Sequence, residues 1–262
     1  MNFRNILTLL ALAASLACGC KSQYELLLEG NDVDAKYKAA FEYFDQGKYS
    51  KSAQLFESLA IVTSGTERDD TVQYYWGLSN YKFRDFYTAE TNFERFIQNY
   101  PHSPFTEAAK YYHIDCMFRS TLRYELDQTP TYKAMTAISE YLIDNPTGEH
   151  AAVCRDMLET LNNRLDRKAY ENARIYYTME DYKAARVALK NVLKDDAENI
   201  YREDILYYTA MASYKYADLS IPAKRRERFL VFMDDYLNFV GEYPESKYRK
   251  ELDNLYAKVK EK

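Results

Sequence analysis

The chain has 262 residues and a formal net charge of −5, with 27 Tyr and 13 Phe but only 7 Gly and 6 Pro. The acidic balance and the lack of a basic block exclude the usual footprint of nucleic-acid binding, so we expect no nucleic-acid partner. Few helix breakers, many Ala, Glu, Lys and Leu residues, and no alternating Val/Ile/Thr runs predict an all-α chain. No apolar run beyond the N-terminus approaches the length of a transmembrane helix.

The N-terminus predicts a lipoprotein signal peptide over residues 1–19. Its apolar stretch is too short to cross a bilayer, which takes about 20 apolar residues. Cys20 follows Gly19, with Ala17 two positions before that glycine, and this ending resembles the lipobox that the lipoprotein signal peptidase reads. We therefore expect the lipid on Cys20. The alternatives are lipidation of Cys18, whose flanking residues fit less well, and a plain secretory signal with incidental cysteines.

A helical repeat is clearest between about residues 70 and 103. Small residues, two phenylalanines and a proline follow one another there at spacings of 12, 4, 3 and 5. They are Gly77, Ala89, Phe93, Phe96 and Pro101. This is the tetratricopeptide pattern, in which two helices cross at small residues and large apolar residues fill the seam to the next helix. We expect Gly77 to meet Ala89 at that crossing.

Four more units complete the predicted superhelix of about five helix-turn-helix repeats. The first, at about residues 33–66, has Ala40 and Ser52 at the small positions, and Gly47 lies in a tight turn that favours the left-handed conformation. The third consists of a helix near 105–121, an insertion near 123–129 and a second helix before Pro146. A long helix from about Glu149 feeds the fourth unit.

The fifth unit has its first helix near 202–219 and its second ending at Pro244, with Ser220 and Pro222 as cap and first-turn signals. A charged helix at 246–260 is expected to cap the solenoid. The predicted segments, in chain order, are a signal peptide (1–19), a lipidated tether (20–32), repeats 1–3 (33–147), and repeats 4–5 with the capping helix (148–262).

No catalytic motif stands out, so we expect neither an enzyme nor a cofactor. There is no Gly-rich phosphate loop, no nucleophile elbow and no paired-histidine zinc helix. His113 and Cys116 lie one helical turn apart, but two ligands do not make a zinc site, so we favour packing and predict no metal. Cys116 and Cys154 lie in half-apolar helical surroundings, where a buried thiol is favoured over a disulfide.

Several phrases strengthen a resemblance to the BamD family, the lipoproteins of the outer-membrane β-barrel assembly machinery. These phrases are Gly47-Lys48-Tyr49, Asn99-Tyr100-Pro101-His102-Ser103, Leu126-Asp127-Gln128, Thr131-Tyr132-Lys133-Ala134 and Glu242-Tyr243-Pro244-Glu245-Ser246-Lys247-Tyr248. The resemblance covers essentially the whole chain and looks most like the Bacteroidetes branch. It implies that the first repeats receive unfolded outer-membrane proteins and that the last repeats dock on a BamA-like insertase. It also implies an outer-membrane protein that is lipid-anchored and faces the periplasm.

Two other functions remain open. A periplasmic tetratricopeptide lipoprotein could coordinate cell-wall synthesis or envelope division instead of barrel assembly. A surface nutrient-binding lipoprotein is a third possibility, but such proteins often carry acidic residues directly after the lipidated cysteine, and Lys21 follows Cys20 here.

An aromatic stripe on the first helix of each early repeat is the candidate peptide-binding groove. Its members are Tyr37, Phe41 and Phe44 in the first unit and Tyr74, Leu78 and Tyr81 in the second. Spacings of four and three place each trio on one helix face, which lines the concave side of tetratricopeptide solenoids. The competing interpretation is that the stripe packs inside the fold, as aromatic stripes at helical spacing usually do.

Four arginines of the fifth unit form the candidate partner interface. They are Arg202, Arg225, Arg226 and Arg228. In an otherwise acidic chain they could meet an acidic patch on the insertase, where charge sets orientation and association rate. The alternative is a solvated helix surface, since exposed charges usually contribute little.

Overall fold

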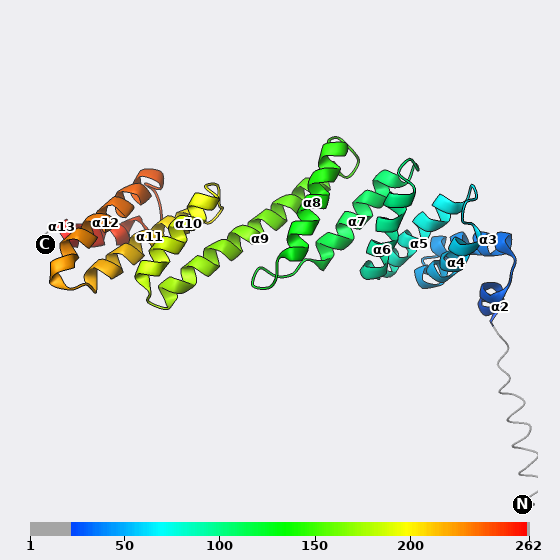
Figure 1. Cartoon of the computed structure of the whole chain (residues 1–262), viewed down its shortest axis with the longest axis horizontal. Helices are drawn as coiled ribbons and strands as arrows, with labels where there is room; N and C mark the ends of the chain where they lie inside the picture. Colours follow the sequence, from blue (N-terminus) through cyan, green and yellow to red (C-terminus); the bar gives the residue numbers. More distant parts are fainter. Residues whose placement is uncertain (1–21, 261–262) are drawn as a thin grey trace, which may run out of the picture. The chain divides into compact units, whose positions relative to one another are not determined.

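The computed structural model describes residues 22–260, and within that range all regular structure is helical. The helices are α2 (Gln23–Glu29), α3 (Val33–Asp45), α4 (Tyr49–Val62), α5 (Asp69–Phe83), α6 (Phe86–Asn99), α7 (Thr106–Ser120), α8 (Thr129–Asp144), α9 (Ala151–Thr178), α10 (Tyr182–Asp195), α11 (Arg202–Asp218), α12 (Pro222–Glu242) and α13 (Arg249–Lys260). Consecutive helices pair into hairpins (Figure 1), so the predicted all-α tetratricopeptide class is confirmed.

The chain divides into two compact units between Ser120 and Thr121. Unit 1 therefore ends with α7, and unit 2 begins ahead of α8. The sequence predicted a boundary later, between residues 147 and 148, after the third repeat. The difference arises because α8, the second helix of that repeat, packs against the long helix α9 and so belongs with the later helices.

The region predicted as a tether contains the short helix α2. Ser22 and Glu25 form a capping box at its start, which satisfies backbone donors that a helix otherwise leaves unpaired. The Tyr24 ring packs edge-on against Tyr43 of α3 at 5.4 Å, and its hydroxyl donates to Gln54 of α4 at 2.7 Å. The part of the predicted tether that the structure describes is therefore a helix packed against the first repeat.

Three hairpins turn through the same backbone geometry. Gly47 has φ 72°, as its sequence position predicted, and Arg84 (φ 71°) and Glu180 (φ 63°) take the left-handed conformation in the turns before α6 and α10. In each turn the next amide donates to a carbonyl five residues back, at 2.8 Å from Lys48 to Tyr43 and at 3.0 Å in the other two. In each hairpin this bond ends the first helix and satisfies one of its last carbonyl groups. Only the first of the three turns has glycine, the residue that favours the left-handed conformation, at this position.

Close helix crossings occur at the predicted small residues. Ala40 and Ser52 are fully buried, and the Ser52 hydroxyl donates to the Ala40 carbonyl at 2.9 Å. A Cβ on Gly77 would lie 3.0 Å from a ring carbon of Phe93, so glycine is needed where α5 meets α6. The closest atoms to Gly77 come from Phe93 and its neighbour in α6 and not from Ala89, the contact that the sequence predicted.

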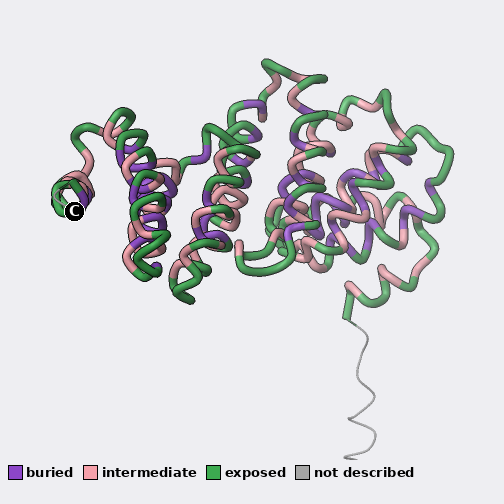
Figure 2. The backbone as a smooth tube through the Cα atoms, turned by 60° about the vertical axis from the view of Figure 1, so that its left-hand side comes forward, coloured by how far each residue is buried: buried purple, intermediate pink, exposed green. Residues whose placement is uncertain are grey.

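The last helices begin differently from the prediction. Ile221 and not Ser220 precedes the first residue of α12, where Pro222 stands as predicted. The Ser220 hydroxyl donates instead to the Tyr216 carbonyl at the end of α11, so it closes one helix and does not cap the next. α13 starts at Arg249, three residues later than predicted, because the segment from Ser246 forms a turn first. Figure 2 shows buried residues recurring along the faces where helices meet.

Candidate functional site

The stripe residues of α3 lie half-buried against neighbouring helices. The Phe41 ring contacts Phe56 of α4 and Tyr75 of α5, with ring centroids 5.0 and 4.7 Å apart. Phe44 meets the same Tyr75 at 5.3 Å. Tyr37 packs on Phe41 at 5.0 Å. The α3 stripe therefore joins the first hairpin to the second.

The stripe residues of α5 are buried more deeply. Tyr74 is 7% exposed and Leu78 is 8% exposed, so both belong to the core of unit 1. The Tyr74 ring stacks on Phe105, ahead of α7, with centroids 4.5 Å apart and planes 11° from parallel. Tyr81 remains half-buried, and its hydroxyl donates to Asp115 of α7 at 2.6 Å.

Stripe and core are thus one packed layer, although the sequence suggested two separate faces. Tyr75, which the stripe did not include, lies at its centre and touches rings of α3, α4 and Phe105. The pair Tyr74-Tyr75 could have indicated this packing from the sequence. Adjacent helical positions point in different directions, so two adjacent tyrosines can contact two different neighbouring helices. Among residues 22–120 the strongly exposed aromatics are Tyr87 and Phe83, at 85% and 54%, beside the α5–α6 turn.

The polar ends of the buried tyrosines keep their protons. Burial raises the pKa of Tyr74 well above its usual range, and nearby Tyr112 raises it further. Burial also raises the pKa of Tyr81, as does its hydrogen bond to the Asp115 carboxylate. Arg119 donates to the same carboxylate, so the nearly buried Asp115 has a cationic partner. Tyr81 therefore acts as a fixed donor within unit 1.

The four arginines do not form one cluster. Arg202 starts α11 and pairs with Glu242 at the far end of α12, through nitrogen–oxygen distances of 2.7 and 2.9 Å. The other three lie in the first two turns of α12, about 25 Å away along that helix at 1.5 Å per residue. The predicted partner interface is therefore two separate places in unit 2.

Three of these arginines are engaged within the fold. Besides the Arg202 pair, Arg225 donates to the carbonyls of Asp218 and Ser220, at 3.1 and 3.2 Å. Arg228 donates to the Ser220 hydroxyl and lies 4.0 Å from the centre of the Tyr216 ring. Only Arg226 is exposed with no hydrogen bond or ion pair to any residue in the range 22–260.

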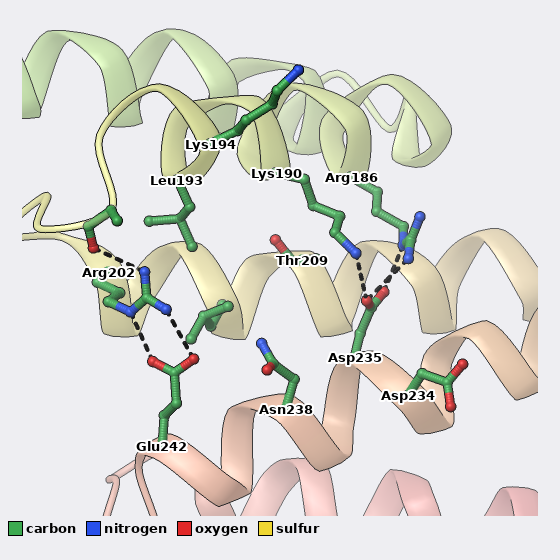
Figure 3. A pocket seen from close by; sticks show the side chains of 12 residues that line it. Arg186, Lys190, Leu193, Lys194, Arg202, Thr209, Asp234, Asp235, Asn238 and Glu242 are labelled. Atoms are coloured by element: carbon green, nitrogen blue, oxygen red, sulfur yellow. Dashed lines mark hydrogen bonds and ion pairs between the residues drawn. The ribbon is translucent and has the colours of Figure 1, made fainter.

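A polar groove of about 600 Å³ runs between α10 and α12 above α11, and sequence reasoning missed it. Arg186 pairs with Asp235 through nitrogen–oxygen distances of 2.6 and 3.0 Å, and the Lys190 Nζ atom lies 3.5 Å from the same carboxylate. Figure 3 shows this cluster at one end, the Arg202–Glu242 pair at the other and Asn238 between them. The partners lie 40 to 49 residues apart in the chain, which no local pattern reveals.

The thiols are buried and carry no sign of reactivity. Cys116 and Cys154 are both reduced, as favoured from the sequence. Burial, assisted by Asp115 and Glu90, raises the pKa of Cys116 to about 12.

Over the part of the chain that the structure describes, no group of three or more His, Cys, Asp or Glu side chains could hold a metal ion. Nor does any helix there have the length and apolarity to span a bilayer. The predicted lipid-bearing Cys20 lies outside the described residues.

Comparison with known proteins gives relatives over most of the chain. Residues 30–230 match the outer membrane lipoprotein family YfiO. The outer membrane protein assembly factor BamD of Caulobacter vibrioides is 24% identical over 234 residues, covering 88% of this chain and 75% of that protein.

The solved structures to which this chain is similar include two tetratricopeptide proteins. The TPR2AB domain of yeast Sti1, solved as a pHSP90 complex, is 13% identical with a TM-score of 0.42, covering 87% of this chain and 98% of that one. A thermophilic TPR protein of Thermus thermophilus is 14% identical with a TM-score of 0.34, covering 87% and 98%. The family match spans well over half of the sequence, and the chain therefore belongs to the YfiO family of outer membrane lipoproteins, the BamD family that its repeats and Tyr-Pro phrases predicted.

Proposed function

We propose that this outer membrane lipoprotein is a lipid-anchored periplasmic scaffold for β-barrel assembly. In this role it binds unfolded outer-membrane proteins with its first repeats and a BamA-like insertase with its last repeats, and it acts by binding and not by catalysis. The observation that carries the proposal is the family match over residues 30–230. Helical hairpins suit the role because they present extended surfaces made from many short, rigid elements.

The anchor is proposed to hold unit 1 at the membrane. Only Lys21 stands between Cys20 and Ser22, which caps the docked helix α2. Two residues reach at most about 7 Å when fully extended, so a lipid on Cys20 would keep the first hairpin at the bilayer surface. Several acyl chains supply a stable hold, since each buried CH₂ contributes about 0.8 kcal/mol. Cys20→Ala should abolish incorporation of labelled fatty acid while Cys18→Ala should not; the reverse result would move the anchor to Cys18.

Client binding is proposed at the half-buried members of the stripe in unit 1. Tyr37, Phe41, Phe44 and Tyr81 keep part of their surface accessible, while Tyr74 and Leu78 lie beneath and support them. Barrel-protein C-termini alternate apolar and polar residues and end in an aromatic residue, so a partly exposed aromatic surface matches their chemistry.

The insertase is proposed to dock on unit 2, where Arg226 is the one of the four predicted arginines that is still available for a partner. Purification of the native lipoprotein from detergent-solubilised outer membrane tests the function. A BamA-like barrel protein should appear in the eluate, and Arg226→Glu should reduce its amount at low salt, because rim charges act chiefly on association. A cell-wall synthase in the eluate without a barrel protein would establish the alternative role in envelope coordination.

A further inference from the structure

A groove of about 470 Å³ lies between the first turns of α12 and the last turn of α13. Its described lining includes Phe229, Leu230 and Val259, together with Arg225, Arg226 and Lys260. Phe229 and Val259 are buried members of the unit 2 core and form the floor. Leu230 stands on the wall with 58% of its surface exposed. The apolar floor and wall can therefore hold an apolar side chain from outside.

The rim of this groove is cationic, and no acidic side chain of residues 22–260 lines it. Its basic residues are Arg225, Arg226 and Lys260. The polar groove between α10 and α12 is the contrast within the same unit, since Arg186 and Arg202 there pair with Asp235 and Glu242. A cationic rim in a chain of net charge −5 favours a partner that brings carboxylates.

Of the two arginines at the rim, Arg226 is open to such a partner and Arg225 is held by the fold. The Arg225 guanidinium is held in place by the Asp218 and Ser220 carbonyls, while its Nε atom is buried and makes no hydrogen bond with described residues. Arg226 is exposed and, over residues 22–260, unpaired. The free Arg226 guanidinium can donate paired hydrogen bonds to a carboxylate, and the fixed charge of Arg225 beside it adds to the attraction.

We propose that this groove binds an acidic amphipathic helix presented by a partner protein. One or two of its apolar side chains fill the space over Phe229 beside Leu230, and flanking Asp or Glu residues meet Arg226 beside the fixed charge of Arg225. Helices bind grooves in this way with apolar anchors at spacings of three, four and seven residues. The concave shape favours a protruding helix over a flat anionic bilayer. The inference rests on the proposed function for the identity of the partner, the insertase, and on the groove alone for the partner's chemistry.

A labelled synthetic peptide tests the chemistry directly. The probe is a helical peptide with leucines at positions i, i+4 and i+7 and glutamates beside them, titrated by fluorescence anisotropy against the detergent-solubilised lipoprotein. Leu230→Ser and Arg226→Glu should each weaken binding about tenfold, since central apolar anchors and arginines dominate such interfaces. The effect of Arg226→Glu should shrink at 0.5 M salt, because salt screens the charge.

Matched controls come from the same helix. Leu237 is similarly exposed, at 53%, and lies outside the groove, so Leu237→Ser should leave binding unchanged. Lys224→Glu changes an exposed charge near the groove without altering its lining and should have a smaller effect than Arg226→Glu. A peptide with lysines in place of the glutamates should bind at least tenfold more weakly.

Several results would overturn the inference. They are no binding of the acidic peptide, equal loss in the groove variants and the control variants, or equal affinity for the lysine peptide. Binding of phosphatidylglycerol vesicles that Leu230→Ser and Arg226→Glu abolish, with no binding of the peptide, would identify a lipid-binding surface instead. Peptide binding without co-purification of a barrel protein would support the groove and count against the insertase as its partner.

Discussion

Unit 1 and unit 2 both join neighbouring hairpins through stacked aromatic rings, and unit 2 adds an ion pair with a buried carboxylate. In unit 1, aromatic rings from α3, α5 and the segment before α7 meet around Tyr75 and Tyr74. In unit 2, the Tyr170 ring of α9 likewise stacks on Tyr201, ahead of α11. Arg186 of α10 also pairs with Asp235 of α12, whereas the Arg202–Glu242 pair links the two helices of the α11–α12 hairpin. The ring stacks and the ion pairs both consist of residues that, from the sequence alone, could also be interpreted as binding groups. Much of each predicted site is therefore already occupied in maintaining the fold, and the remainder is where partners can bind.

The largest expected effect tests the aromatic layer of unit 1. Tyr74→Ala should lower the free energy of unfolding by about 3 kcal/mol, because it removes a large buried ring that stacks on Phe105. Chemical denaturation measures the loss, and hydrogen exchange should locate it in α5, α6 and α7. Tyr74→Phe is the control and should cost far less, since it keeps the ring. A Tyr74→Ala variant that keeps its stability but loses client peptide binding would show that the ring belongs to an open groove.

The second test removes the central carboxylate of unit 2. Asp235→Ala should destabilise the protein by about 2 kcal/mol, because it leaves Arg186 and Lys190 beside a vacated buried position. Asp235 is only 7% exposed. Glu242→Ala, which breaks the more exposed pair with Arg202, should cost less than about 1 kcal/mol in the same denaturation experiment. Equal losses would mean that burial does not distinguish the two pairs.

The third test concerns the left-handed hairpin turn, which occurs in both units. Arg84→Gly in unit 1 and Glu180→Gly in unit 2 should each stabilise the chain by about 0.5 kcal/mol. Glycine removes the penalty of the left-handed conformation, about 1–2 kcal/mol, but loses more backbone entropy on folding. Denaturation midpoints of the two variants measure the gain. Destabilisation in either turn would indicate that the Arg84 or Glu180 side chain contributes more than its conformation costs.

The smallest effect concerns acid sensitivity, which we expect in unit 1. Burial lowers the pKa of His113 below its usual 6.5, partly offset by Glu94, so the unfolded chain binds this proton more readily than the folded one. Stability from the neutral imidazole is thus present above pH 6.5 and declines as the pH falls below it. Its slope stays under the limit of about 1.4 kcal/mol per pH unit for one proton. His113→Gln should flatten the pH dependence of the denaturation midpoint between pH 7 and 5; an unchanged profile would contradict this assignment.

Local chemistry in the sequence determined the helical framework. Gly47 specified a left-handed turn, and the prolines after α6, α8 and α12 marked helix ends, because neither effect depends on distant residues. The small residues Ala40, Ser52 and Gly77 indicated close crossings, since only small side chains allow backbones to approach. The order of these signals also carried the family resemblance. Ser220 is the instructive failure, because a serine before a helix can bond backward as well as forward.

Only the tertiary structure decided which faces are open. The sequence placed Tyr74 and Tyr81 on one helical face, but whether that face meets solvent or α7 depends on helices that pack about 30 residues later. Arg202 and Arg226 likewise look alike in the sequence, and one finds Glu242 forty residues away while the other finds no partner in residues 22–260. Helical periodicity fixes the direction of a side chain relative to its own helix. Burial and pairing depend on which other helix lies in that direction, and that is a property of the packed chain.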